Sequence, residues 1–160
     1  MMEYESKAAV FSSDRKYRYS LWRGWDRKKS YVMFIGLNPS TADEIEDDPT
    51  IRRCVGFARD WGYGGLCMTN LFAVRATNPQ EMMLHPEPIG VDTNYWLLKY
   101  AWKAEVIDAS WGAKGGYQQR DEVVYDLLES MMCLGLTKAG HPKHPLYLPS
   151  DALLEEMPSG

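Results

Sequence analysis

Two amides and two histidines are the side chains whose types and positions suggest chemistry. Asn38 and Asn70 each end an apolar run, and His141 and His144 lie in a proline-rich segment near the end of the chain. An amide donates and accepts hydrogen bonds at once, so it can read the edge of a base, and it can also hold a water molecule without changing charge. A nearby histidine can transfer a proton or donate to a developing oxyanion.

The residues around Asn38 should aim its side chain. The apolar run of residues 31–35 ends in Gly36-Leu37-Asn38-Pro39-Ser40. A proline restricts the residue before it to extended geometry, which fixes the direction of the amide. Because the chain has no Gly-x-Ser-x-Gly turn, we expect Ser40 to cap the next segment rather than to act as a nucleophile.

The apolar periodicity predicts strands that alternate with helices. Strands are expected over residues 17–25, 31–37, 65–72, 105–110 and 133–137, and helices over 50–61, 91–103, 118–131 and 150–157, with a short helical turn near 81–84. Asp48 or Thr50 should cap the helix over 50–61, and Gly62 should end it.

This alternation predicts an α/β fold. We expect residues 1–160 to form a single domain, a three-layer α/β/α sandwich around a central, mostly parallel four-stranded sheet, with an N-terminal antiparallel strand or hairpin. Right-handed crossovers then place the carboxyl ends of the strands at one edge. Asn38, Asn70, Trp111-Gly112 and residues 140–148 should therefore line one crevice.

Composition and missing motifs exclude several function classes. The chain has no dinucleotide-binding or P-loop motif, and its three cysteines have no metal-like spacing, so we expect no metal and no cofactor. No apolar run approaches the roughly 20 residues that cross a bilayer, and the N-terminus lacks a signal peptide. These features predict a cytoplasmic protein with free, buried thiols and no membrane partner.

The charge distribution leaves contact with nucleic acid open. A formal charge of -4 and a pI near 5.4 count against a general nucleic-acid binder. Seven basic side chains nevertheless cluster in residues 15–29. This cluster is either a solvated hairpin face or a local contact for phosphates.

Four short motifs resemble a known superfamily. Gly36-Leu37-Asn38-Pro39 is similar to the first motif of the uracil-DNA glycosylase superfamily, in its Gly-x-Asn-Pro form. The segment 67–76, Ser110-Trp111-Gly112 and the segment 141–146 resemble three further motifs, in the superfamily's order. The chain also resembles a family of small, functionally uncharacterised bacterial and phage proteins that carry Gly-Leu-Asn-Pro-Ser-Thr-Ala-Asp, as residues 36–43 do here.

The glycosylase resemblance implies a uracil-DNA glycosylase-like fold and a base flipped out of DNA into the crevice. Asn38 would position the attacking water, and Asn70 would read the base edge. His144, or alternatively His141, would donate to the base oxygen as charge develops. His144 is favoured because the sequence His144-Pro145-Leu146 places a wedge candidate, Leu146, immediately after His-Pro. The remaining base-binding candidates are Gly36, Leu37, Pro39 and Trp111.

The same resemblance implies contacts with the DNA around the base. Leu146 and Tyr147 would fill the vacated stack, and Ser40, Lys138 and Lys143 would contact phosphates. The aromatic that stacks on the base is not fixed by motif spacing, and Phe57, Tyr117 and Trp111 are all candidates. Asp48 and Arg53 either adapt the pocket to a bulkier base or belong to a capped helix.

The expected function is therefore that of a monofunctional DNA glycosylase, which hydrolyses the N-glycosidic bond of uracil or another modified base and leaves an abasic site. A non-catalytic nucleotide or nucleic-acid binding module is the alternative from another class, and a nucleoside or nucleotide hydrolase is a third. Asn38 stands where faster superfamily members have Asp, so weaker activation of water is expected.

Overall fold

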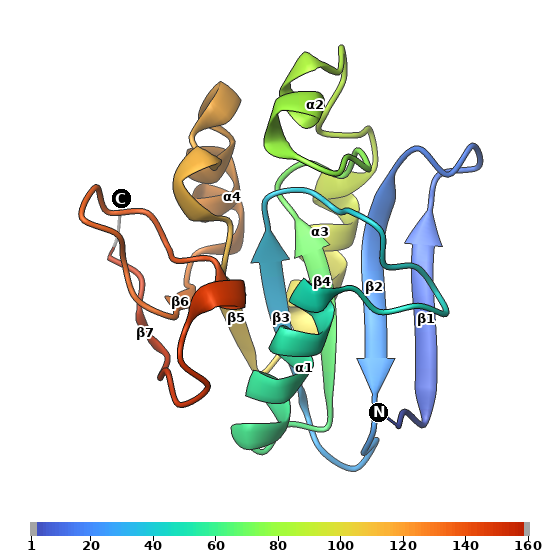
Figure 1. The fold of residues 1–160 in the computed structure, drawn as a ribbon, viewed down its shortest axis with the longest axis vertical. Helices are drawn as coiled ribbons and strands as arrows, with labels where there is room; N and C mark the ends of the chain where they lie inside the picture. Colours follow the sequence, from blue (N-terminus) through green and yellow to red (C-terminus); the bar gives the residue numbers. More distant parts are fainter. Residues whose placement is uncertain (1–2, 159–160) are drawn as a thin grey trace.

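A seven-stranded mixed sheet organises the chain, and the computed structural model describes residues 3–158 (Figure 1). The order across the sheet is β1-β2-β4-β3-β5-β6-β7. The strands are β1 (Ser6–Phe11), β2 (Arg18–Gly24), β3 (Tyr31–Gly36), β4 (Gly65–Asn70), β5 (Val106–Ala109), β6 (Met132–Cys133) and β7 (Glu155–Glu156). Neighbouring strands from β4 to β6 are parallel, whereas the β1–β2, β2–β4 and β6–β7 pairs are antiparallel.

The predicted four-stranded, mostly parallel sheet is therefore wrong. The sheet has seven strands, and three of its six pairings in the described residues are antiparallel. The glycosylase-like sheet implied by the resemblance is corrected with it. The added strands come from both ends of the chain: the hairpin β1–β2 extends the sheet beyond β4, and β7 pairs with β6.

The helix predicted over 150–157 is also wrong, since this segment contains β7 and no helix. A helix of eight residues is marginal without tertiary support. Pairing of Glu155 and Glu156 with Cys133 and Met132 instead satisfies backbone groups on the open edge of β6.

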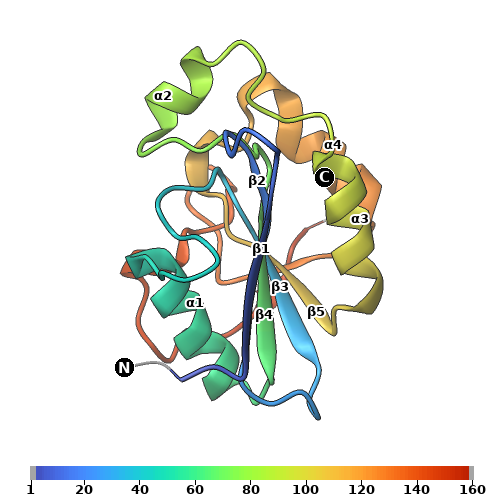
Figure 2. The ribbon, with the colours of Figure 1, turned by 90° about the vertical axis from the view of Figure 1, so that its right-hand side faces the viewer.

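Helices cover both faces of the sheet (Figure 2). Helix α1 (Pro49–Asp60) lies on one face, and α3 (Thr93–Lys103) and α4 (Arg120–Leu128) lie on the other. The short helix α2 (Pro79–Leu84) lies beyond the carboxyl ends of the parallel strands (Figure 1). Three single 3₁₀ turns complete the set: η1 (Gly112–Lys114), η2 (Tyr117–Gln119) and η3 (Pro145–Tyr147). In the described residues, none of the helices combines the length and the apolar character that a membrane crossing requires.

Strand β3 is buried on both faces, as its continuous apolar sequence predicts. Val32 and Phe34 pack in the cluster under α1, and Met33 and Ile35 pack in the cluster under α3 and α4. β3 is thus a rigid support for the residues that follow Gly36.

Local signals define α1 as predicted. Asp48 is its N-cap and accepts a hydrogen bond from the Ile51 amide at 2.9 Å, and Pro49 occupies the first turn. After the helix, Gly62 adopts φ +88°, the left-handed conformation that glycine allows without strain. The helix therefore begins directly after the loop of residues 40–48, which follows Asn38 and Pro39.

Candidate active-site cleft

The ends of three parallel strands are joined by backbone hydrogen bonds just beyond the sheet. The amide of Leu71 donates to the carbonyl of Gly36, and the amide of Ser110 donates to the carbonyl of Ile35, both at 2.9 Å. The amide of Gly112 donates to Pro142, also at 2.9 Å, which brings the last segment alongside β5. The four predicted strand-end segments therefore meet.

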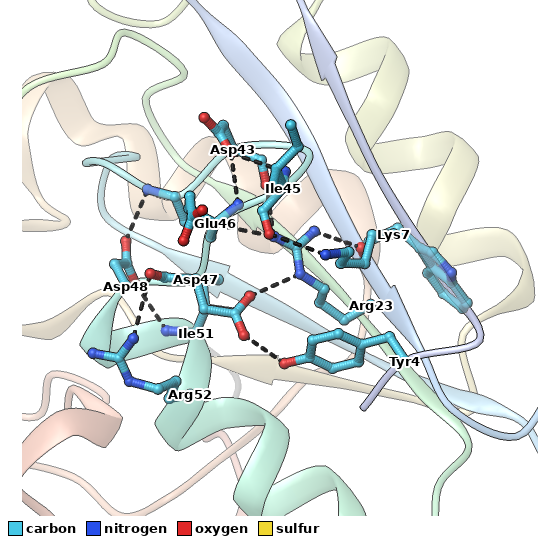
Figure 3. A network of polar contacts seen from close by, with 12 residues as sticks. Tyr4, Lys7, Arg23, Asp43, Ile45, Glu46, Asp47, Asp48, Ile51 and Arg52 are labelled. Atoms are coloured by element: carbon cyan, nitrogen blue, oxygen red, sulfur yellow. Dashed lines mark hydrogen bonds and ion pairs between the residues drawn. The ribbon is translucent and has the colours of Figure 1, made fainter. Parts of the chain in front are cut away.

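Residues 40–48 form a loop that is anchored to the sheet by Arg23 (Figure 3). Arg23 is fully buried, and its Nε donates to Asp47 Oδ1 at 2.8 Å. Its Nη2 donates to the carbonyls of Asp43 and Glu46, and Tyr4 donates to the second oxygen of Asp47 at 2.6 Å. These bonds fix the loop that follows Pro39 as one wall of a cleft.

The cleft has a volume of about 560 Å³ and opens at the carboxyl edge of β3 and β4. A cavity of this size is in the range of small-molecule sites. Many of the predicted site residues line it: Gly36, Leu37, Asn38, Pro39, Ser40, Asn70, Trp111, His144, Leu146 and Tyr147. Asn38, Asn70 and His144 thus share one cavity.

The amide of Asn38 is oriented by two hydrogen bonds. Its Nδ2 donates to the carbonyl of Ala76 at 2.9 Å and to that of Pro39 at 3.1 Å. Because both protons of the amide are used, its Oδ1 is the atom left to accept a bond from water or ligand. The arrangement suits a residue that holds a water molecule.

Asn70 is almost completely buried, with 4% of its surface exposed, and no described residue accepts a bond from its Nδ2. Its Oδ1 lies against the Cα side of Gly36, where a Cβ would have no room. A buried donor without a partner is costly, so a ligand in the cleft that accepts this bond would be favoured.

His144 begins the turn η3, and its Nδ1 accepts a hydrogen bond from the Leu146 amide at 3.2 Å. In the neutral ring the proton is therefore on Nε2. His144 is an exposed residue, but partial loss of water around its ring lowers its pKa below the ordinary value, and the charge of Asp48 acts in the other direction. His144 is thus a neutral Nε2–H donor at pH 7.

Trp111 forms a buried wall of the cleft, and its Nε1 has no acceptor among the described residues. The other two candidates for stacking on a base lie elsewhere. Phe57 packs in the core against Trp61, and Tyr117 packs against Phe72 and donates to the carbonyl of Met83. Trp111 is the one of the three that lines the cleft.

His141, Lys138 and Lys143 do not line this cleft. His141 lines a separate hollow, together with Trp111, Asp126 and Pro142. Lys138 and Lys143 are exposed. Arg53 lines a small separate hollow with Phe57 and Ser150 and does not line the cleft, whereas Asp48 does.

The chain matches one protein family, described as protein of unknown function (DUF1643), over residues 18–146. The chain belongs to the DUF1643 family. No curated protein and no solved structure matches it. The DUF1643 match begins at Arg18 and ends at Leu146, so it includes every residue lining the cleft except Tyr147.

Two charged residues of this DUF1643 cleft, Arg18 and Lys114, are absent from the sequence-based set of site residues. Arg18 is 2% exposed and reaches the cleft from β2, and Lys114 is exposed at its rim. From the sequence, Arg18 stands out only as one of the seven basic side chains in residues 15–29, because the alternation of this strand puts it among the polar positions. In the described residues, no group of three or more His, Cys, Asp or Glu could hold a metal ion.

Proposed function

We propose that the chain is a monofunctional DNA glycosylase, which hydrolyses the N-glycosidic bond of a modified base flipped into the cleft. The observation that carries the proposal is the meeting of Asn38, Asn70 and His144 in one cavity of about 560 Å³. These side chains offer an acceptor for water, a buried hydrogen-bonding group for a base edge and a neutral donor for a leaving group.

Asn38 would hold the water that attacks C1′ of the sugar. Its Oδ1 is free because its Nδ2 protons bind the carbonyls of Ala76 and Pro39. The water oxygen forms a bond to C1′ as the bond from C1′ to the base nitrogen breaks, and the electron pair leaves with the base. The proton lost by the water ends on the departing base, so the products are a free base and an abasic site.

His144 would stabilise the negative charge that develops on the base. A neutral Nε2–H donor is enough for this role, since a preorganised donor costs no reorganisation during the reaction. The bond from the Leu146 amide holds the tautomer and the ring direction.

The cleft rim offers groups for the surrounding DNA. Tyr147 is 89% exposed on η3 and could replace the flipped base in the stack, whereas Leu146 is half-buried and supports the turn. Ser40 and Lys114 lie at the cleft for phosphate contacts. Lys138 and Lys143 are candidates for phosphates farther along the strand. The three described cysteines are free and buried, which suits the reducing cytoplasm that we propose for this activity.

One observation favours a non-catalytic base-binding module as the second candidate. Asp48 supplies the one carboxylate that lines the described cleft, and its oxygens accept bonds from the Ile51 and Ala42 amides at 2.9 and 3.4 Å. A carboxylate committed to a helix cap is a poor base for activating water.

Base release from DNA separates these two functions. Single- and double-stranded oligonucleotides with one uracil, hypoxanthine or modified pyrimidine are incubated with the protein, and abasic sites are cut with alkali. Breaks that are lost in Asn38→Ala support the glycosylase. Base-dependent binding with no abasic product on any oligonucleotide would replace it with the binding module.

A further inference from the structure

Two buried arginines on β2 point to the same loop but differ in their partners. Arg23 is 0% exposed and binds the Asp47 carboxylate and the carbonyls of Trp22, Asp43 and Glu46. Figure 3 shows this network closed around Arg23. Arg18 is 2% exposed, and its guanidinium makes one hydrogen bond to the described residues, from Nη1 to the carbonyl of Ala42 at 2.9 Å.

Arg18 has no carboxylate partner within the described residues. Asp48 lines the same cleft, and its negative charge favours the charged form of Arg18, but the two side chains form no ion pair; the Asp48 oxygens accept bonds from the Ile51 and Ala42 amides. Burial lowers the pKa of Arg18 to about 10, so the side chain stays charged at neutral pH. A buried guanidinium with one hydrogen bond and no ion pair is unfavourable, which points to an acceptor that the protein does not itself provide.

The buried polar atoms of the cleft that lack a hydrogen-bond partner in the described part of the chain are all donors. Arg18 Nε, Asn70 Nδ2 and Trp111 Nε1 are all buried, all lack an acceptor among the described residues, and all belong to side chains that line this cleft. The Nε and Nη2 edge of a guanidinium is a fork that matches two acceptor atoms lying side by side. Uracil does not offer such a pair, because its two carbonyls flank an N–H donor.

We propose that Arg18 selects bases that present two adjacent acceptor atoms to the cleft. Such a pair is the O6 and N7 edge of a 6-oxopurine or the carboxylate of an acidic modified pyrimidine. The inference deepens the proposed function, on which it rests for the binding of a base in this cleft. Asn70 Nδ2 and Trp111 Nε1 then supply further donors to the same ligand.

Thermal unfolding without ligand tests whether Arg18 lacks a stabilising partner in the folded protein. Arg18→Met removes the unpaired charge and keeps most of the volume, so its thermal midpoint should equal or exceed that of the native protein. The matched control Arg23→Met leaves Asp47 and three carbonyls without a donor and should lower the midpoint strongly. Equal losses in both variants would make Arg18 a structural residue and overturn the proposal.

Binding measurements test the selection itself. Fluorescence anisotropy is followed with single-stranded oligonucleotides that carry one hypoxanthine, 7-deazahypoxanthine, uracil or 5-carboxyuracil. The native protein should prefer hypoxanthine to its 7-deaza analogue, or 5-carboxyuracil to uracil, by about 10-fold, and the pair that shows the preference identifies the source of the acceptors. Arg18→Met should abolish the preference, whereas Lys114→Met should weaken the binding of all four oligonucleotides by the same factor.

The outcomes separate this inference from the proposed function. In one result, affinity differs among the four bases while hypoxanthine equals 7-deazahypoxanthine and 5-carboxyuracil equals uracil; in another, a preference within one of these pairs survives in Arg18→Met. Either result overturns the role of Arg18 and leaves the base-binding cleft standing. Equal affinity for all four oligonucleotides overturns the proposed function and this inference together.

Discussion

Gly36 and Asn70 are register partners at the ends of β3 and β4, and the amide of Asn70 fills the space that a side chain on Gly36 would need. A Cβ at position 36 would lie 2.8 Å from Asn70 Oδ1. The absence of a side chain at Gly36 therefore sets the position of the buried amide in the cleft.

Gly36→Ala should displace Asn70 and weaken base binding while the sheet still forms, because the contact is with a side chain and Gly36 has no left-handed φ. We expect roughly 10-fold weaker binding of the preferred oligonucleotide by anisotropy. Gly56→Ala is the matched control: a Cβ there meets nothing within 4 Å, and alanine stabilises a helix interior by about 1 kcal/mol. Native affinity in Gly36→Ala would show that Asn70 does not bind the ligand.

Asn38→Asp should destabilise the protein at neutral pH, although a carboxylate could in principle activate water. Asn38 Nδ2 donates to the carbonyls of Ala76 and Pro39, and a carboxylate would instead place an acceptor against them. The free energy of unfolding in urea should fall by about 1–3 kcal/mol at pH 7.5.

The loss of unfolding free energy in Asn38→Asp should become smaller as pH is lowered toward 4.5. Facing carbonyls raise the carboxyl pKa in the folded state, so the stabilising protonated form is present at low pH and is lost as pH rises. An unchanged free energy of unfolding at both pH values would mean that the amide bonds of Asn38 do not hold the loop.

His144 should make base release depend on pH on the acid side only. Burial lowers its pKa below the ordinary value of about 6.5, so the ring is neutral at pH 7–8 and activity should be flat there. As pH falls below about 6.5, the unfolded chain takes up a proton that the folded ring does not, so stability should decline. Activity should decline at lower pH, where the folded ring is protonated and loses the Nδ1 bond from the Leu146 amide.

Variants of His144 test the same assignment. His144→Asn keeps an acceptor for the Leu146 amide and a donor for the base, so it should retain more activity than His144→Ala. His141→Ala should behave as the native protein, because His141 lines a different hollow. A larger loss in His141→Ala than in His144→Ala would reverse the assignment.

Asp108 should reduce stability as pH rises. Its side chain is fully buried on β5, neither carboxyl oxygen has a hydrogen-bond partner among the described residues, and burial raises its pKa well above the ordinary value. The folded state therefore keeps a proton that the unfolded chain releases above about pH 4, and stability falls from there toward the folded pKa.

Asp108→Asn should remove this dependence at nearly constant shape. The free energy of unfolding in urea is measured for both proteins between pH 5 and 8. The value for the variant should rise relative to that of the native protein as pH increases. Parallel curves would mean that Asp108 is paired or solvated in the folded protein.

Local signals in the sequence predict the parts of the fold that depend on local structure. Asp48, Pro49 and Gly62 mark the ends of α1, and the continuous apolar run of residues 31–35 predicts a strand, β3, that is buried on both faces. Pairings between distant segments are not encoded in this way, so β7 and the count of antiparallel pairings are missed. The helix expected from residue 118 begins at Arg120, because Gln118 and Gln119 both have positive φ.

The candidate site follows the same division. The strand-end rule brings Asn38, Asn70 and Trp111 together from the sequence alone. It does not separate His141 from His144, because both precede proline; the residues after His144 favour it in the sequence, and the structure places His144 in the cleft. Arg18 is missed because its burial depends on a loop more than twenty residues away in sequence.

Base release under single-turnover conditions tests the central claim most directly. Native protein, Asn38→Ala, His144→Ala and His141→Ala are compared on the oligonucleotide that binds best, and the free base is quantified. We predict release by the native protein and His141→Ala, and losses of about 100-fold or more in Asn38→Ala and His144→Ala. Release that is equal in all four proteins, or absent in the native protein on every base tested, would contradict a catalytic cleft built from Asn38 and His144.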